Sequence, residues 1–157
     1  MSDDVVFAFE QDFAGSLRCI PMSVRLKLDL CGVKLSLRQW SRFTADDRRR
    51  LLAQVCENHP AVVTFRDDLV TLVRSRTGEA AVSLVVEPHA PWDDPDRLPE
   101  RLTERTSSLG LASPSLEQWA ALTRLQRYAL CKLIRPGHDN DNLEPALREF
   151  GLLAVTS

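Results

Sequence analysis

Side chains with nucleophilic or metal-binding chemistry lie far apart in this sequence. Its cysteines are Cys19, Cys31, Cys56 and Cys131, and no two of them form the Cys-x-x-Cys pair typical of a local zinc site. Cys31 and Cys131 fall at helical spacing among apolar residues, which favours small buried side chains. Cys19 lies in an irregular stretch and is the candidate for an exposed thiol, but no base accompanies it. The pattern therefore indicates reduced, unreactive cysteines rather than a catalytic one.

Two histidines, His89 and His138, fall in expected loops. Either they are surface groups that make ordinary hydrogen bonds, or they join Cys19 in a dispersed metal site. The sequence contains no glycine-rich phosphate loop, no Gly-x-Ser-x-Gly and no His-Glu-x-x-His. We therefore expect a protein without catalytic residues, bound cofactor or metal, and keep the dispersed site as the alternative.

Charged and aromatic residues alternate in an arm before the first expected helix. This arm contains Phe9, Glu10 and Asp12, followed by Arg18 and Arg25. Two interpretations are open, because the arginines are able to pair with the two carboxylates or to contact a partner.

A proline-bracketed tryptophan is the second unusual feature. Trp92 follows Pro91 within residues 87–92, and Pro95 comes shortly after. An indole in such a loop either packs back on the core as a lid or offers an aromatic anchor to a partner.

The elements that position these residues are predicted to be mainly helices. Proline, serine or threonine at the start and glycine at the end mark helices near 21–31, 37–43, 61–76, 99–110 and 143–150, and Thr44, Ser115 and Thr123 each cap another. Alternation near residues 5–10 suggests a short strand, and residues 82–86 suggest a strand or an extended cover.

The pattern Ser-Leu-x-Gln-Trp occurs twice, at residues 36–40 and 115–119. When Trp40 is aligned with Trp119, Thr44 meets Thr123 and Arg48 meets Arg127. We interpret this as one helical unit used twice around a common core, although two similar capped helix pairs could arise by coincidence. The resulting prediction is a single all-α domain over 1–157, with halves at 20–78 and 98–151, a proline-rich linker at 79–97 and a short extended N-terminal arm.

The net charge and the distribution of apolar residues exclude some classes of binding partner. The net charge of the 157 residues is −2, which lacks the basic excess of a nucleic-acid binder. No segment is apolar for the length of a membrane span, and the N-terminus lacks the layout of a secretory signal. We expect a cytoplasmic protein that binds neither nucleic acid nor membrane.

The N-terminal arm, the expected helices and the proline-rich segment together resemble a known family. The resemblance covers nearly the whole chain, in order and with similar spacing. The chain resembles the nitrate-reductase-associated protein family. The shared residues are Phe9-Glu10, Asp12-Phe13, Ser16-Leu17-Arg18-Cys19-Ile20-Pro21-Met22, Val24-Arg25, Lys27-Leu28-Asp29, Cys31-Gly32-Val33-Lys34-Leu35, Glu87-Pro88-His89, Pro91-Trp92, Gln118-Trp119, Leu122-Thr123, Leu125-Gln126-Arg127, Arg135-Pro136, His138, Pro145-Ala146-Leu147 and Glu149-Phe150.

The resemblance implies an accessory role in making or activating a molybdenum-dependent assimilatory nitrate reductase, or another molybdenum enzyme, through protein contacts. It implies no catalysis. The candidate partner-binding residues are Phe9, Glu10, Asp12, Arg18, Arg25, His89, Trp92, Arg135 and His138. The alternative is a carrier that holds a metal or a molybdopterin-type ligand through His89, His138 and Cys19.

Overall fold

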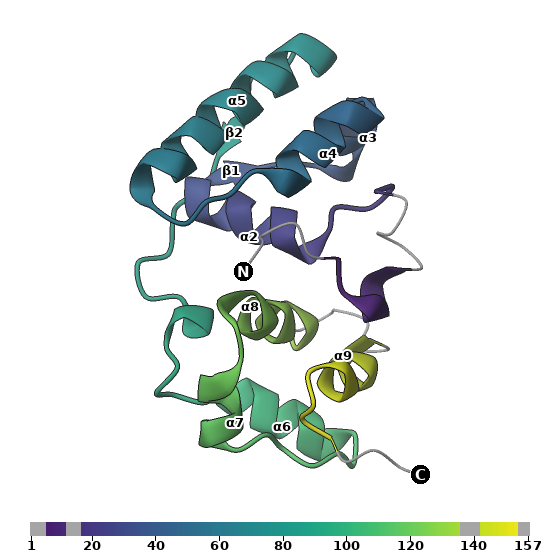
Figure 1. Ribbon diagram of the computed structural model, residues 1–157, viewed down its shortest axis with the longest axis vertical. Helices are drawn as coiled ribbons and strands as arrows, with labels where there is room; N and C mark the ends of the chain where they lie inside the picture. Colours follow the sequence, from purple (N-terminus) through teal and green to yellow (C-terminus); the bar gives the residue numbers. More distant parts are fainter. Residues whose placement is uncertain (1–5, 12–16, 136–141, 154–157) are drawn as a thin grey trace. The chain divides into compact units, whose positions relative to one another are not determined.

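The chain is mainly helical, as the sequence predicts. The structure, a computed structural model, describes residues 6–11, 17–135 and 142–153. These residues contain eight α-helices, two short 3-10 helices and one two-stranded sheet (Figure 1). Within the same ranges, no helix has both the length and the apolar character needed to cross a membrane.

The chain divides into two compact units, Met1–Glu87 and Pro88–Ser157. The division falls inside residues 79–97, where the sequence predicts a linker. That segment also carries short elements of its own, β2 and η2. A single domain over 1–157 stays a prediction.

The first unit contains four α-helices and a short antiparallel sheet in its described part. Its elements are η1 (Ala8–Glu10), α2 (Met22–Cys31), β1 (Val33–Lys34), α3 (Leu37–Arg42), α4 (Ala45–Ala53), α5 (His59–Thr77) and β2 (Val82–Ser83). In the sheet, Val33 lies opposite Ser83 and Lys34 lies opposite Val82. The sequence indicates the extended segment of β2 but not its pairing with β1.

Local capping explains where the helices of the first unit begin and end. Thr44 and Asp47 form the predicted capping box of α4, with the Asp47 N–H donating to Thr44 Oγ1 at 3.0 Å and the Thr44 N–H donating to Asp47 Oδ2 at 2.9 Å. Asn58 starts α5 at His59, earlier than predicted, because its side chain accepts from the Ala61 N–H at 2.9 Å.

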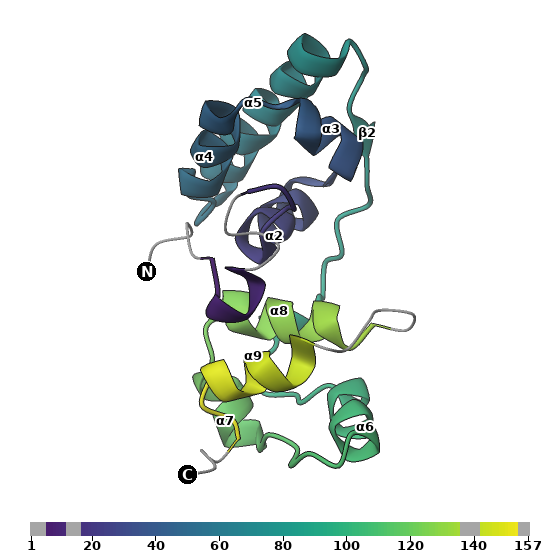
Figure 2. The same cartoon turned by 90° about the vertical axis from the view of Figure 1, so that its right-hand side faces the viewer.

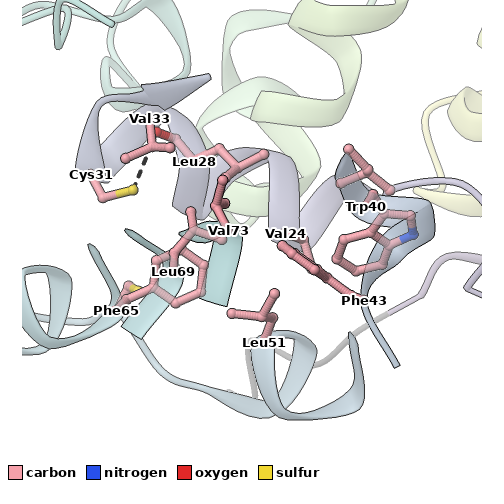
Figure 3. Close-up of a cluster of buried hydrophobic side chains, with 12 residues drawn as sticks. Val24, Leu28, Cys31, Val33, Trp40, Phe43, Leu51, Phe65, Leu69 and Val73 are labelled. Atoms are coloured by element: carbon pink, nitrogen blue, oxygen red, sulfur yellow. Dashed lines mark hydrogen bonds between the residues drawn. The ribbon is translucent and has the colours of Figure 1, made fainter. Parts of the chain in front are cut away.

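Apolar side chains from α2, α3, α4 and α5 meet in the core of the first unit (Figure 3). Trp40 and Phe65 are fully buried there. The Trp40 ring meets Phe43 edge-on, with ring centroids 6.0 Å apart. Trp40 is thus a core anchor, as predicted. Large aromatic side chains at such positions contribute much of the apolar area that a small unit buries.

The prediction of a strand near residues 5–10 is wrong for residues 8–10, because Ala8–Glu10 form a 3-10 helix. The side chain of Glu10 folds back, and its Oε1 accepts from the Phe7 N–H at 3.0 Å. This side-chain bond turns the backbone where simple alternation favours an extended path.

The second unit contains η2 (Pro91–Asp93), α6 (Glu100–Ser108), α7 (Leu116–Ala121), α8 (Arg124–Leu133) and α9 (Leu143–Glu149). Helices α8 and α9 lie side by side in Figures 1 and 2. The predicted boxes that begin α7 and α8 are present, with Gln118 paired to Ser115 and Gln126 paired to Thr123. Trp119 in α7 is fully buried, again as a core anchor.

Candidate functional site

The proline-bracketed tryptophan packs against its own unit. Trp92 is 9% exposed, and its ring meets Tyr128 of α8 edge-on with centroids 4.9 Å apart. The Lys132 ammonium lies 5.7 Å from the centre of the Trp92 ring, within cation–π range. Of the two interpretations of Trp92, the geometry favours the lid.

Side chains of α7 and α8 hold the backbone around η2. The Arg127 Nε donates to the Trp92 carbonyl at 2.8 Å, and the Trp119 indole N–H donates to the Asp94 carbonyl at 2.9 Å. Arg124 forms a two-point ion pair with Asp93, at 2.6 and 3.1 Å. Burial lowers the pKa of the Arg127 guanidinium from its ordinary value. The loop therefore has a fixed path.

A cleft of about 700 Å³ opens beside this anchored segment. All of its lining residues fall within 88–101, so it belongs to the second unit alone. Its apolar wall consists of Pro88, Ala90, Pro91 and Pro99.

The polar wall of the cleft mixes both signs of charge. Its members are His89, Asp93, Asp94, Arg97, Glu100 and Arg101. His89 is exposed here, so the structure brings one predicted site residue into a concave, accessible place.

Glu10 in the N-terminal arm has a structural role as a hydrogen-bond acceptor for backbone N–H groups. Its carboxylate is fully buried, and its two oxygens accept from the Phe7 N–H at 3.0 Å and the Met22 N–H at 3.1 Å. Met22 is the first residue of α2, and Pro21 before it offers no side-chain cap, so Glu10 supplies the acceptor from a distance. The predicted partner contact of Glu10 gains no support from this geometry.

The remaining predicted contact residues of the arm and of α2 differ in exposure. Phe9 is half-buried and stacks on Phe7, with ring centroids 5.5 Å apart. The Arg25 Nε donates to the Ile20 carbonyl at 3.2 Å, whereas Arg18 is exposed. Asp12, the other carboxylate of the predicted pairing, lies outside the described residues.

The chain matches the family described as conserved nitrate reductase-associated protein over residues 6–150. It belongs to this family. The resemblance drawn from the sequence is thereby confirmed, and the match spans both units, including the anchored segment and the cleft. No curated protein and no solved structure gives a significant match.

Membership in the nitrate reductase-associated family does not decide between a protein-binding and a ligand-carrying role. Among the described residues, no group of three or more His, Cys, Asp or Glu side chains is arranged to hold a metal ion. The carrier alternative used three residues of which His138 lies outside the described ranges, while Cys19 and His89 belong to different units. That alternative stays a prediction.

The cysteines behave mostly as small apolar side chains. Cys31 and Cys56 are buried, and burial raises the pKa of the Cys31 thiol, which keeps it protonated. Cys19 is half-buried rather than exposed, and so is Cys131.

Sequence reasoning missed the arginines that build and line this site. Arg127 stood out only as the counterpart of Arg48 in the repeated pattern and as one of the residues shared with the family, and it was not selected as a site residue. Arg48 likewise donates to two main-chain carbonyls, those of Trp40 and Ser41 at 3.2 and 3.1 Å, whereas Arg127 donates to those of Trp92 and Leu122. The sequence pattern did not single out Arg97 and Arg101 as site residues, because they alternate with acidic residues in a stretch where the charges balance. Arg135, which sequence reasoning did select, is exposed just after α8.

Proposed function

We propose that this chain is a non-catalytic accessory protein that promotes the biogenesis or activity of a molybdenum-dependent assimilatory nitrate reductase by direct contact. The observation that supports this most is the family match over residues 6–150, a family described by its association with nitrate reductase. The proposal places the protein in the cytoplasm with its partner.

The exposed members of the predicted contact set are the best starting points for mapping the interface. Arg18, His89 and Arg135 are exposed, whereas Glu10 and Trp92 are buried. We assign partner contact to these three exposed side chains and a supporting role to the two buried ones. Exposed charged groups are removed with little effect on folding, which makes them suitable for surface variants.

Co-purification with the reductase tests the proposal. Full-length protein with an affinity tag, expressed from its own locus, should retain nitrate reductase, and deletion of the gene should lower nitrate reductase activity and the molybdenum content of the enzyme. The variants R18A, H89A and R135A should weaken retention, while R74A, an exposed arginine of α5, should not. Normal activity and normal molybdenum content in the deletion strain, together with no retention, would sink the proposal.

We also infer that the two units arose from one helical unit used twice. In each unit, the indole of the repeated tryptophan donates to a carbonyl shortly before the unit's proline-started helix. Trp40 donates to Leu17 at 2.8 Å ahead of α2, and Trp119 donates to Asp94 at 2.9 Å ahead of α6. Arg48 and Arg127 each donate to two main-chain carbonyls of their own unit, which adds support. In this interpretation the arm and the Pro88–Asp94 segment are equivalent parts.

A further inference from the structure

The cleft at residues 88–101 has the size and the mixed lining of a small-molecule site. Its volume of about 700 Å³ falls within the range of roughly 300–1,000 Å³ common for ligand pockets. One wall is apolar and rigid, since three of its four members are prolines and the backbone behind it is held by α7 and α8. Such a wall suits the uncharged body of a ligand.

Among the described residues, the guanidinium groups of Arg97 and Arg101 at the cleft have no hydrogen-bond or ion-pair partner. Arg97 precedes α6 and Arg101 lies in its first turn, and both are exposed. Within the part of the chain that the structure describes, neither forms a hydrogen bond or an ion pair, in contrast to Arg124 and Arg127. A guanidinium fork binds planar carboxylates and other oxyanions through paired N–H donors.

The acidic residues of the lining restrict the charge that the cleft accepts. Asp93 is paired with Arg124, and Asp94 Oδ1 accepts from the Asp96 N–H at 3.0 Å. Glu100 stands in the first turn of α6, where a carboxylate is favourable. With Arg124 included, three arginines balance three carboxylates. Because the lining carries no excess positive charge, each added negative charge on a ligand raises the repulsion from Asp94 and Glu100, so a single carboxylate that accepts from Arg97 and Arg101 is favoured over a multiply charged anion.

We propose that this cleft binds a ligand with one carboxylate and an apolar body, the carboxylate between Arg97 and Arg101 and the body against the wall of Pro88, Pro91 and Pro99. The carboxylate comes from a free small acid or from a peptide. The cleft shares His89 with the proposed contact surface for nitrate reductase, but the ligand is held by Arg97, Arg101 and the prolines, which that contact does not use.

Amide chemical shifts of the full-length protein test the site. Benzoate is the probe, benzamide is its neutral counterpart, and phenyl phosphate carries the higher charge. We expect saturable shifts at residues 88–101 with benzoate, at least about tenfold weaker binding of benzamide, and no tighter binding of phenyl phosphate. N-acetylphenylalanine and its amide separate the sources, because tighter binding than benzoate indicates a peptide carboxylate and weaker binding indicates a free acid.

Variants of exposed residues complete the test. R97Q/R101Q should weaken benzoate binding at least about tenfold, and E100Q should tighten it about twofold, because one repelling charge is removed. R74Q, from the other unit, should bind benzoate like the wild type. Equal shifts with benzamide, shifts centred outside 88–101, or unchanged affinity in R97Q/R101Q would overturn the assignment. Co-purification with nitrate reductase is a separate measurement that tests only the proposed contact with the reductase. A negative result in one experiment therefore leaves the other proposal standing.

Discussion

Two buried tryptophans of the second unit differ in the hydrogen bonding of their indole nitrogens. Trp119 donates its indole N–H to the Asp94 carbonyl, while the Trp92 indole nitrogen is buried without an acceptor among the described residues. Both side chains are large and nearly or fully buried, so comparing them tests the contribution of the Trp119 hydrogen bond.

We expect W119F to lower the free energy of unfolding by about 1 kcal/mol more than W92F. Both substitutions remove similar apolar area, but only W119F removes a hydrogen bond, the one to the Asp94 carbonyl. Urea unfolding of both variants, followed by circular dichroism, measures the difference within one unit. Equal losses, or a larger loss in W92F, would contradict the assigned role of the Trp119 bond.

A buried carboxylate makes the stability of the first unit depend on pH. Asp47 is 5% exposed, and its ion pair with Arg76 at 2.8 Å lowers the pKa of the carboxyl, with the Thr44 N–H as a further donor. The folded form thus binds fewer protons than the unfolded form. Its contribution is present above the ordinary Asp pKa near 4 and is lost as pH falls through the lower folded pKa.

D47N should therefore be about 1–2 kcal/mol less stable than the wild type at pH 7, and this gap should shrink as pH falls below about 4. The control is D46N, since Asp46 is exposed and its pair with Arg49 contributes little. Urea midpoints between pH 2 and 7 give the comparison. A gap that stays constant over this range would show that the pair does not titrate with folding.

At the scale of elements, two glycines end helices in the same left-handed conformation but in different surroundings. Gly32 ends α2 with φ +72°, and Gly78 ends α5 with φ +73°. A methyl group at position 32 would lie 2.8 Å from the Leu84 carbonyl and 2.9 Å from Val86, whereas position 78 has open space.

We expect G78A to cost about 1 kcal/mol, the strain of alanine in this conformation. G32A should cost at least about 1 kcal/mol more, because the backbone beyond β2 would have to move. The free energy of unfolding measures both, and faster exchange of the Leu84 amide, which donates to the Gly32 carbonyl at 2.7 Å, would locate the damage in G32A. Similar costs at the two positions would rule out the close approach.

The helices were largely predictable because their signals are local. Ser115, Thr123 and Gly32 each act on residues within one turn, so sequence spacing was enough. The turn at η1 was mispredicted because Glu10 reaches back to Phe7 and across to Met22, contacts that alternation does not encode. The pairing of β1 with β2 was missed for the same reason, since its partners lie far apart in the sequence.

At the scale of the whole molecule, the candidate site was predicted only in part. His89 and Trp92 stood out through the prolines around them, and the geometry gives them different roles, since His89 lines the cleft and Trp92 is buried against Tyr128. Arg97 and Arg101 did not stand out, because a cleft is defined by how a segment folds back and not by spacing along it. The boundary between Met1–Glu87 and Pro88–Ser157 emerges from contacts, whereas the sequence predicts only a linker at 79–97 that contains it.

The anchors of the Pro88–Asp94 segment have a consequence for how binding preference changes over evolution. Arg127 and Trp119 donate hydrogen bonds to carbonyl oxygens of the main chain, which every amino acid possesses. Side chains at the rim of the cleft are thus free to be exchanged while the path of the chain is kept. Members of one lineage could acquire new ligand selectivity through a few rim substitutions, without first having to evolve a new scaffold.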